Sequence, residues 1–169
     1  FMLDEAHAFG IIGPQGRGLA AELGIETQVD LQMGTFSKGT GLSGGYLCSS
    51  RSLIDLLTNK ARSFIYSTAP SPSLAATISD CLDLITGDEG DQLRSKLWTN
   101  IHTFRTKAES AIVPIIIGEN EPALEAAEKL KNKGFLVPAI RYPTVPRGTA
   151  RLRVTLSAAH SDDQIESLN

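Results

Sequence analysis

Apolar and polar positions alternate along the chain with two different periods. Residues 29–34, 46–49 and 151–156 form short apolar or alternating runs, which are typical of β-strands. Residues 51–61 and 74–86 carry apolar side chains at three- and four-residue spacing, which predicts helices. By the same criteria we expect further strands at residues 1–3, 63–67, 113–117 and 135–140, and further helices at residues 19–23, 92–107, 121–133 and 162–168.

The order of these elements predicts the fold class. Alternating strands and helices in the first part are typical of an α/β layer with a mostly parallel sheet, and residues 1–3 would be the end of a buried strand. A smaller unit of strand, helix, two strands and helix follows, which is typical of an α+β domain. We expect the α/β layer at residues 1–90, a bridging helix at residues 91–107 and the small domain, in incomplete form, at residues 108–169.

Composition narrows the class of protein. Of the 169 residues, 41% are hydrophobic and 21% charged, as in globular proteins, and the net charge of −3 gives no reason to expect nucleic acid or a membrane as partner. The longest apolar run, residues 111–118, is too short to cross a bilayer, so we expect a cytoplasmic protein. Cys48 and Cys81 lack CxxC spacing and are expected to be buried free thiols. Three scattered histidines predict no metal site.

Two chemically important segments follow strands of the expected α/β layer. Asp4 and His7 come directly after the first strand, and Lys38 lies in the glycine-rich segment 34–41. Because the carboxyl ends of parallel strands meet at one edge of an open sheet, these side chains would face the same crevice. Pyridoxal 5′-phosphate (PLP) requires a lysine that binds its aldehyde, a carboxylate that keeps its ring nitrogen protonated, and donors for its phosphate. The spacing therefore favours a PLP site.

The same letters permit a second interpretation. Residues 3–7 (LDEAH) also spell the acidic box of some helicases, in which carboxylates position Mg²⁺ and water for ATP hydrolysis. A phosphate-binding loop of the form GxxxxGK followed by Ser or Thr normally accompanies that box. Within this chain Lys38 is preceded by Ser37 and not by glycine, and the downstream sequence lacks the basic character of a nucleic-acid motor. A segment preceding this chain could still supply such a loop.

Four longer segments occur in the order found in a known family. They are residues 4–18 (DEAHAFGIIGPQGRG), 34–50 (GTFSKGTGLSGGYLCSS), 64–72 (FIYSTAPSP) and 140–161 (IRYPTVPRGTARLRVTLSAAHS). Together they resemble the carboxy-terminal half of the α-oxoamine synthases, which are PLP-dependent acyltransferases of fold type I with an aminotransferase-like fold. The last two segments most resemble members that condense L-alanine with a pimeloyl thioester, with decarboxylation, in biotin biosynthesis. The alternative is another member, such as 2-amino-3-ketobutyrate CoA ligase.

The resemblance implies a role for each matching residue. Asp4 would pair with the cofactor ring nitrogen, His7 would approach the ring hydroxyl, and Lys38 would bind PLP covalently and act on the substrate. Thr35 would bind the phosphate, and Ser67 and Thr68 would reach the phosphate of the neighbouring subunit. Arg153 would hold the amino-acid carboxylate, and Arg141 would line the acyl-chain region. The site would thus lie at the interface of a homodimer. Simpler roles stay open: His7 in a turn, Ser67 and Thr68 as helix caps, and Arg141 and Arg151 as surface charges.

The chain also departs from the family pattern. Both ends read as interruptions, so we expect a part of a larger protein, and the family's amino-terminal half has no counterpart here. Near residues 108–110 the relatives have a longer stretch. These differences favour an active parent enzyme and an inactive fragment that need not hold PLP. The hypothesis from another class is therefore a cofactor-free fragment that folds and self-associates. The sequence identifies neither the amino-acid substrate nor the carrier of the acyl group, which would be CoA or a carrier protein.

Overall fold

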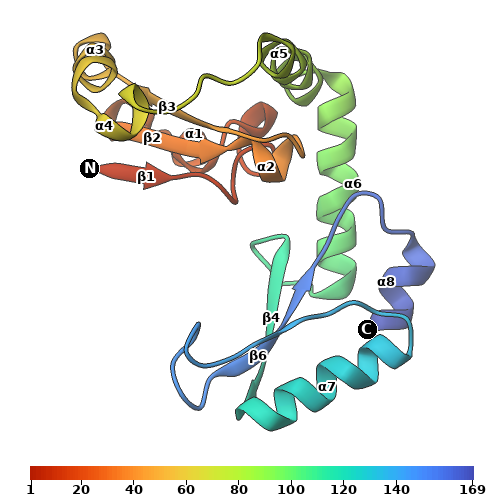
Figure 1. Ribbon diagram of the computed structural model, residues 1–169. Coiled ribbons are helices and arrows are strands. Elements are labelled where there is room, and N and C mark those ends of the chain that lie inside the picture. Colours follow the sequence, from red (N-terminus) through yellow and green to blue (C-terminus); the bar gives the residue numbers. More distant parts are fainter. The chain divides into compact units, whose positions relative to one another are not determined.

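The computed structural model describes all residues from 1 to 169 and consists of two compact units, Phe1–Arg94 and Ser95–Asn169 (Figure 1). Each unit has its own three-stranded sheet. None of the helices is long and apolar enough to span a membrane. The expected division at residues 1–90, 91–107 and 108–169 stays a prediction.

The first unit is built on a mixed sheet with strand order β1-β2-β3 (Figure 1). β1 (Met2–Asp4) runs parallel to β2 (Leu31–Thr35), and β3 (Gly45–Ser49) runs antiparallel to β2. The α/β class is confirmed, with one parallel and one antiparallel pair among these strands. Met2–Asp4 is mostly exposed, so the expected burial of the first strand is wrong. A strand at the edge of a sheet has a neighbour on one side only.

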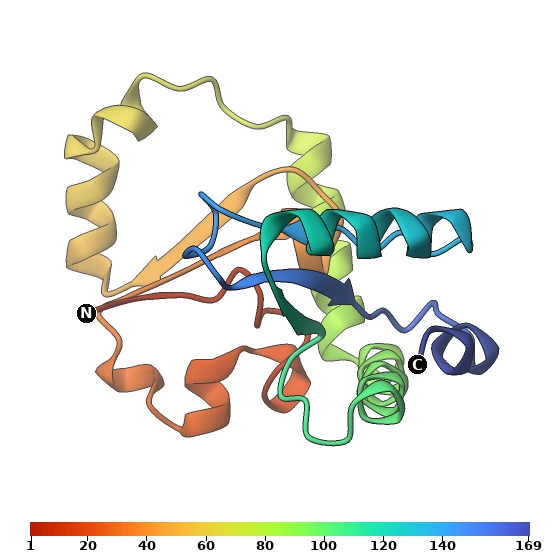
Figure 2. The same ribbon diagram turned by 90° about the horizontal axis from the view of Figure 1, so that it is seen from below.

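Short helices connect these strands, and longer ones follow them. They are η1 (Pro14–Gly16), α1 (Leu19–Leu23), η2 (Glu26–Gln28), α2 (Phe36–Gly39), α3 (Arg51–Lys60), α4 (Arg62–Ile65) and α5 (Pro72–Thr86). Serine side chains begin the two longest: Ser50 accepts a hydrogen bond from the Leu53 amide, and Ser71 accepts one from the Leu74 amide. In Figure 2, α1 lies on one side of the strands and α3 with α4 on the other.

Two further expectations for the first unit are wrong. Residues 63–67 were expected as a strand, but α4 is a single helical turn in which the amides of Phe64 and Ile65 both donate to the carbonyl of Ala61 at 3.0 Å. β-Branched and aromatic residues favour a strand only where a neighbouring strand takes up their amides. Both cysteines are free, as expected, but Cys48 is exposed and Cys81 only half-buried.

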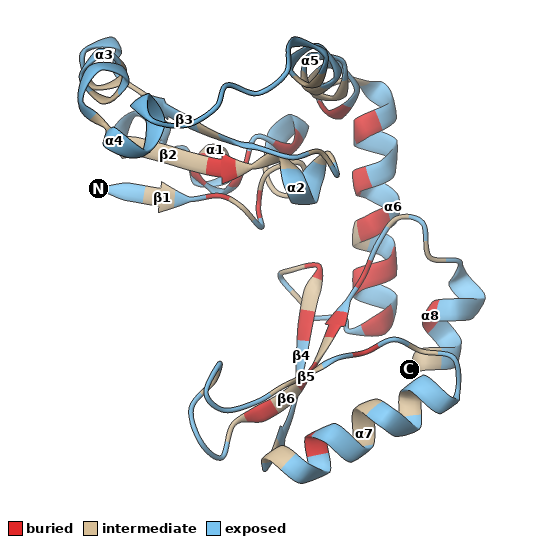
Figure 3. Cartoon of the chain, in the orientation of Figure 1, coloured by how far each residue is buried: buried red, intermediate tan, exposed pale blue.

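The long helix α6 (Asp88–Phe104) carries buried residues along one stripe (Figure 3). Leu97, Ile101 and Phe104 are buried, as their spacing predicts, but Leu93 is 46% exposed. Arg94 is buried instead, where it donates to the carbonyl of Ile85 at 2.7 Å and pairs with Asp91. The charged residue is therefore satisfied locally, which hydrophobic periodicity alone does not reveal.

The second unit has the strand order β4-β6-β5, with all neighbours antiparallel. Its elements are β4 (Ile112–Gly118), α7 (Asn120–Asn132), β5 (Ala139–Ile140), β6 (Ala150–Thr155) and α8 (Asp162–Leu168). In β6, Ala150, Leu152 and Val154 are buried and the residues between them are not, which is the alternation that the sequence predicts. α7 packs against all three strands.

The strand expected at residues 135–140 is shortened to Ala139–Ile140. Pro138 has no amide hydrogen and contributes only its carbonyl oxygen, which accepts from the Arg153 amide at 2.9 Å.

The side chain of Asn100 on α6 is buried and donates to the carbonyls of Ser157 (2.9 Å) and His160 (3.1 Å). These bonds fix the segment that leads into α8.

Candidate active site

Two neighbouring parallel strands of the first unit end at the same edge of the sheet. Asp4 is the last residue of β1 and lies opposite Met33, while β2 continues to Thr35 and then enters α2 at once. Lys38 lies in α2, which Figure 1 shows at the end of β2. The glycine-rich segment around Lys38 is thus partly a one-turn helix. The carboxylate of Asp4 and the amine of Lys38 therefore emerge at one sheet edge.

The turn after β1 presents Asp4 and His7 to the surface. Asp4 is exposed, and its Oδ1 accepts a hydrogen bond from the amide of Ala6 at 2.9 Å. This bond orients the carboxylate across the turn and leaves further acceptor positions on its oxygens. His7 follows in the same turn, is exposed and takes part in a further interaction.

The neighbouring Glu5 has the opposite environment. It is 1% exposed, and its carboxylate accepts from the amides of Leu19 and Ala20, each at 2.9 Å, and from Gln32 Nε2 at 3.3 Å. A Cβ on Gly18 would lie 2.8 Å from this carboxyl group. Glu5 therefore serves as the cap of α1, a role that sequence reasoning missed because its partners lie 14 and 15 residues away.

The helicase interpretation requires an acidic pair directed at a metal ion. Both oxygens of Glu5 are instead bound to backbone amides inside the unit. No group of three or more His, Cys, Asp and Glu side chains in the chain is arranged to hold a metal ion. The geometry therefore favours the interpretation in which Asp4 acts without Glu5.

Thr35 caps the short helix that carries Lys38. Its Oγ1 caps α2 by accepting from the Ser37 amide at 3.1 Å, and it donates to the carbonyl of Gly44 at 3.0 Å. The Phe36 amide also donates to Gly44, at 3.0 Å. Lys38 is exposed in this frame. The Thr35 hydroxyl is therefore already bound within the chain, and its expected contact with a phosphate stays a prediction.

An aromatic cluster lies behind this edge. Tyr46 on β3 has its ring centroid 5.3 Å from those of Phe9 and Phe36, which are 6.2 Å from one another. Burial, followed by the negative charges of Cys48, Glu5 and Asp4, raises the pKa of Tyr46 to about 12. Sequence reasoning did not single out these three rings.

Ser67 and Thr68 are exposed after α4. The Ser67 hydroxyl donates to the carbonyl of Phe64 at 2.8 Å. The simpler interpretation of these two residues, as caps of the following helix, is wrong because α5 is capped by Ser71. Their expected contact with a neighbouring subunit stays a prediction.

The two arginines expected to bind substrate belong to the second unit. Arg153 on β6 has a buried Nε without a hydrogen-bond partner. In contrast, Arg151 donates its Nε–H to the carbonyl of Thr149 at 2.9 Å, and exposed Arg141 has a long contact of 3.4 Å to the Tyr142 carbonyl. A buried unpaired guanidinium nitrogen is costly unless an anion meets it, so Arg153 fits a carboxylate-binding role.

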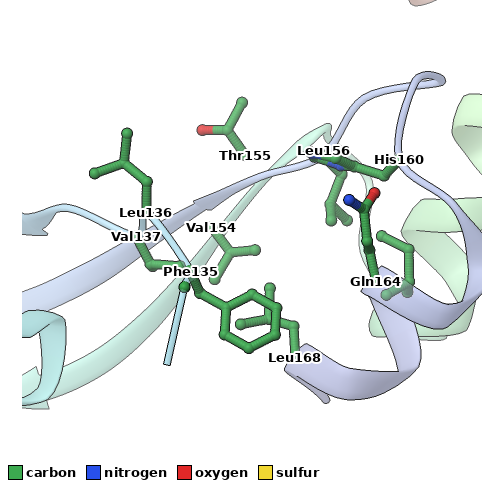
Figure 4. A pocket seen from close by; sticks show the side chains of 11 residues that line it. Phe135, Leu136, Val137, Val154, Thr155, Leu156, His160, Gln164 and Leu168 are labelled. Carbon is green, nitrogen blue, oxygen red and sulfur yellow. The ribbon is translucent and has the colours of Figure 1, made fainter. Parts of the chain in front are cut away.

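A separate pocket of about 230 Å³ lies in the second unit (Figure 4). Apolar side chains such as Phe135, Val154 and Leu168 line most of it, with His160 and Gln164 at one side. It includes none of the residues predicted for the active site. The pocket therefore adds nothing to the arrangement of Asp4 and Lys38.

Comparison with known proteins identifies the family. The sequence matches the aminotransferase class I and II profile over residues 1–168. The chain belongs to the aminotransferase class I and II family. This confirms the aminotransferase-like fold that the four sequence segments indicated.

Individual relatives narrow the resemblance. An 8-amino-7-oxononanoate synthase from Herminiimonas arsenicoxydans is 47% identical over 180 residues, which cover 99% of this chain and 46% of the relative. A serine palmitoyltransferase from S. paucimobilis with a bound PLP–myriocin aldimine is 30% identical, with a TM-score of 0.90, over 99% of this chain and 44% of that one. An 8-amino-7-oxononanoate synthase from Francisella tularensis is 27% identical, with a TM-score of 0.85, over 98% of this chain and 51% of that one.

These relatives confirm the resemblance to the α-oxoamine synthases and the PLP-dependent fold type I. The chain spans less than half the length of the curated relatives it matches.

Proposed function

We propose that this chain is part of a PLP-dependent acyltransferase that joins L-alanine to a pimeloyl thioester. The products would be 8-amino-7-oxononanoate, carbon dioxide and the free thiol, and the reaction would serve biotin biosynthesis. The observation that carries the proposal is the position of Asp4 and Lys38 at the ends of neighbouring parallel strands. The names of the curated relatives and the PLP in the S. paucimobilis structure support it.

The residues at this edge fit PLP. Asp4 is exposed and keeps acceptor positions for a protonated ring nitrogen, and the exposed amine of Lys38 lies at the same edge. His7 would approach the ring hydroxyl, and Thr35, with Ser67 and Thr68 of the neighbouring subunit, would hold the phosphate. When bound, PLP supplies an electron-withdrawing ring that stabilises negative charge at the Cα of the amino acid.

The chain's own groups would then move protons and hold the substrate. Lys38 Nζ would take the proton from the alanine Cα, because an amine that holds the cofactor aldehyde would be next to that carbon once alanine takes its place. Asp4 would keep the ring nitrogen protonated throughout. Arg153 would hold the alanine carboxylate, since its Nε is buried and unpaired in the second unit.

The remaining partners are part of the same proposal. The active site would lie at the interface of a homodimer, and Arg141 would line the region of the acyl chain. The acyl donor would be a thioester of CoA or of a carrier protein. Glycine with acetyl-CoA, as in 2-amino-3-ketobutyrate CoA ligase, is the alternative pair of substrates.

A second candidate is a cofactor-free fragment that folds and self-associates. The exposed apolar side chains of α4 and the residue after it favour it, because Phe64 is 63% and Tyr66 76% exposed. The outer edge of β1 also has no neighbouring strand. The two candidates differ in whether Lys38 binds PLP.

The test is to add PLP to this chain and to record absorbance between about 300 and 500 nm. We expect a band that is lost in Lys38→Ala and kept in Lys60→Ala, which replaces another exposed lysine of the same unit. Borohydride reduction and peptide mapping should place the cofactor on Lys38. Equal bands in all three proteins, or no band in any of them, would contradict the proposal for this chain. In the longer parent protein, product formation from alanine with pimeloyl-CoA is then compared with that from glycine with acetyl-CoA.

A further inference from the structure

Two short turns that contact one another carry Asp4 and Lys38. We call residues 4–9 the Asp4 turn and residues 35–40 the Lys38 turn. A Cβ on Gly39 would lie 3.0 Å from the carbonyl oxygen of Phe9 and 3.2 Å from its ring, so the two turns are in close contact there. The amides of Ala8 and Phe9 both donate to the carbonyl of Glu5 at 2.9 Å, which fixes the Asp4 turn internally. A contact that orients the Asp4 turn or the Lys38 turn therefore also orients the other one.

Three aromatic rings join both turns to β3. Phe9 belongs to the Asp4 turn and Phe36 to the Lys38 turn, and Tyr46 lies 5.3 Å from each of them between ring centroids. Tyr46 lies opposite Gly34 in the β2–β3 pair, where a Cβ would approach the Tyr46 Cζ to 2.5 Å. The ring therefore lies directly on the backbone of β2, just before this strand enters the Lys38 turn.

The geometry of α2 relates the aromatic cluster to the direction of Lys38. Residues two apart in a helix differ by about 200° around its axis. Phe36 is half-buried and packs against the rings, whereas Lys38 is exposed. A fixed Phe36 ring thus directs the Lys38 amine to the opposite side of the helical turn.

We propose that Tyr46 is a positioning residue whose ring, resting on Gly34 and packed against Phe9 and Phe36, fixes the spacing of the Asp4 carboxylate and the Lys38 amine. The inference rests on the proposed function, because only a site that uses both groups needs their spacing. Burial and the neighbouring negative charges raise the pKa of this phenol to about 12, so it stays neutral at physiological pH. The contacts of Tyr46 with Gly34, Phe9 and Phe36 therefore act through the packing of a neutral ring.

The experiment compares Tyr46→Ala with Tyr46→Phe in the full 169-residue chain. Each protein is treated with PLP and borohydride, and mass spectrometry gives the ratio of label on Lys38 to label on Lys60. We expect Tyr46→Ala to lower this ratio by about tenfold or more, since small displacements of a reacting group have large effects on rate. Tyr46→Phe keeps the ring, and its labelling ratio should stay within about twofold of that of the unsubstituted 169-residue chain. Tyr66→Ala removes an exposed tyrosine from the same unit and serves as control.

Hydrogen exchange provides a readout that needs no cofactor. Loss of the ring should speed exchange of the Phe9 and Phe36 amides together, while amides of the second unit stay unchanged. If the unsubstituted 169-residue chain shows no preference of the PLP label for Lys38 over Lys60, the proposed function fails. The hydrogen-exchange data alone then decide this inference. A Tyr46→Ala protein with a lower melting temperature but an unchanged labelling ratio, or with faster exchange in β3 alone, would overturn it. If Tyr46→Ala does not fold, Tyr46→Leu gives the same comparison.

Discussion

Gly34 lies directly opposite Tyr46 in the antiparallel β2–β3 pair, and a Cβ at position 34 would lie 2.5 Å from the Cζ of that tyrosine. Non-bonded carbon atoms do not approach one another to this distance, so either the ring or the backbone would have to move. Glycine at this position therefore lets an aromatic ring lie on the strand that leads to Lys38. The contact is a requirement of packing, because Gly34 is buried within the sheet.

We expect Gly34→Ala to lower the free energy of unfolding by about 2 kcal/mol, because the Tyr46 ring must move away from its neighbours. Urea denaturation measures the change. Gly24→Ala is the control: no atom lies within 4 Å of its Cβ, and its left-handed backbone (φ +64°) costs about 1 kcal/mol by itself. The double variant Gly34→Ala, Tyr46→Ala should lose less than the sum of its single variants. Strict additivity would show that the two residues do not compete for space.

Glu5→Gln should lower the free energy of unfolding by about 2 kcal/mol, because an amide oxygen replaces one of two charged acceptors and its NH₂ group faces a backbone donor. The affected amides belong to Leu19 and Ala20. Glu22→Gln, at an exposed position of the same short helix, should change stability little. Equal stability of both variants in thermal and urea unfolding would exclude the capping role of Glu5.

Arg153→Lys should raise the KM for the amino acid by about tenfold to a hundredfold in the longer parent enzyme, because an ammonium group cannot form the paired bonds of a guanidinium group. Arg151→Lys is the matched control, since Arg151 donates to the Thr149 carbonyl of its own strand region. The proposal for Arg153 predicts a change in KM for alanine that is much larger than the change for the acyl donor. A similar effect of both variants would assign the carboxylate contact elsewhere.

Stability should fall at alkaline pH because of Tyr46. Its pKa is about 12 in the folded chain and 10.0 in the unfolded reference, so between these values the unfolded state binds fewer protons. The free energy of unfolding is therefore unaffected by this group below about pH 10 and falls above it, by up to about 1.4 kcal/mol per pH unit. Urea unfolding at several pH values should show a shallower decline in Tyr46→Phe. Parallel pH profiles of the two proteins would contradict the expectation.

Much of the fold is predictable from residue spacing. The helices at α3, α5, α6 and α7 follow from apolar positions at three- and four-residue intervals, and the alternation in β6 gives its buried face. The position of Asp4 and Lys38 at one sheet edge follows from strands that end at Asp4 and shortly before Lys38. These features depend on neighbours along the chain or on a general property of parallel sheets.

Features that depend on distant partners were not predictable. The Glu5 cap joins segments 14 and 15 residues apart, and the aromatic cluster joins Phe9 to two rings on other elements. Residues 63–67 have strand-forming side chains, but their amides find partners within one turn. The unpaired Nε of Arg153 is likewise a property of burial and not of sequence pattern. In each case a tertiary contact decides what local propensity leaves open.

The register of β1 decides which of two adjacent carboxylates is exposed at the sheet edge. Asp4 lies opposite Met33 and is exposed, while Glu5 is buried against the start of α1. Because successive residues point to opposite faces, a shift by one position would move Asp4 to the place of Glu5 and Leu3 to the place of Asp4. Asp4 would then meet the helix amides with a side chain one methylene too short, and the sheet edge would carry a leucine in place of a carboxylate. We therefore expect this segment to vary among relatives by substitution and not by insertion or deletion of single residues.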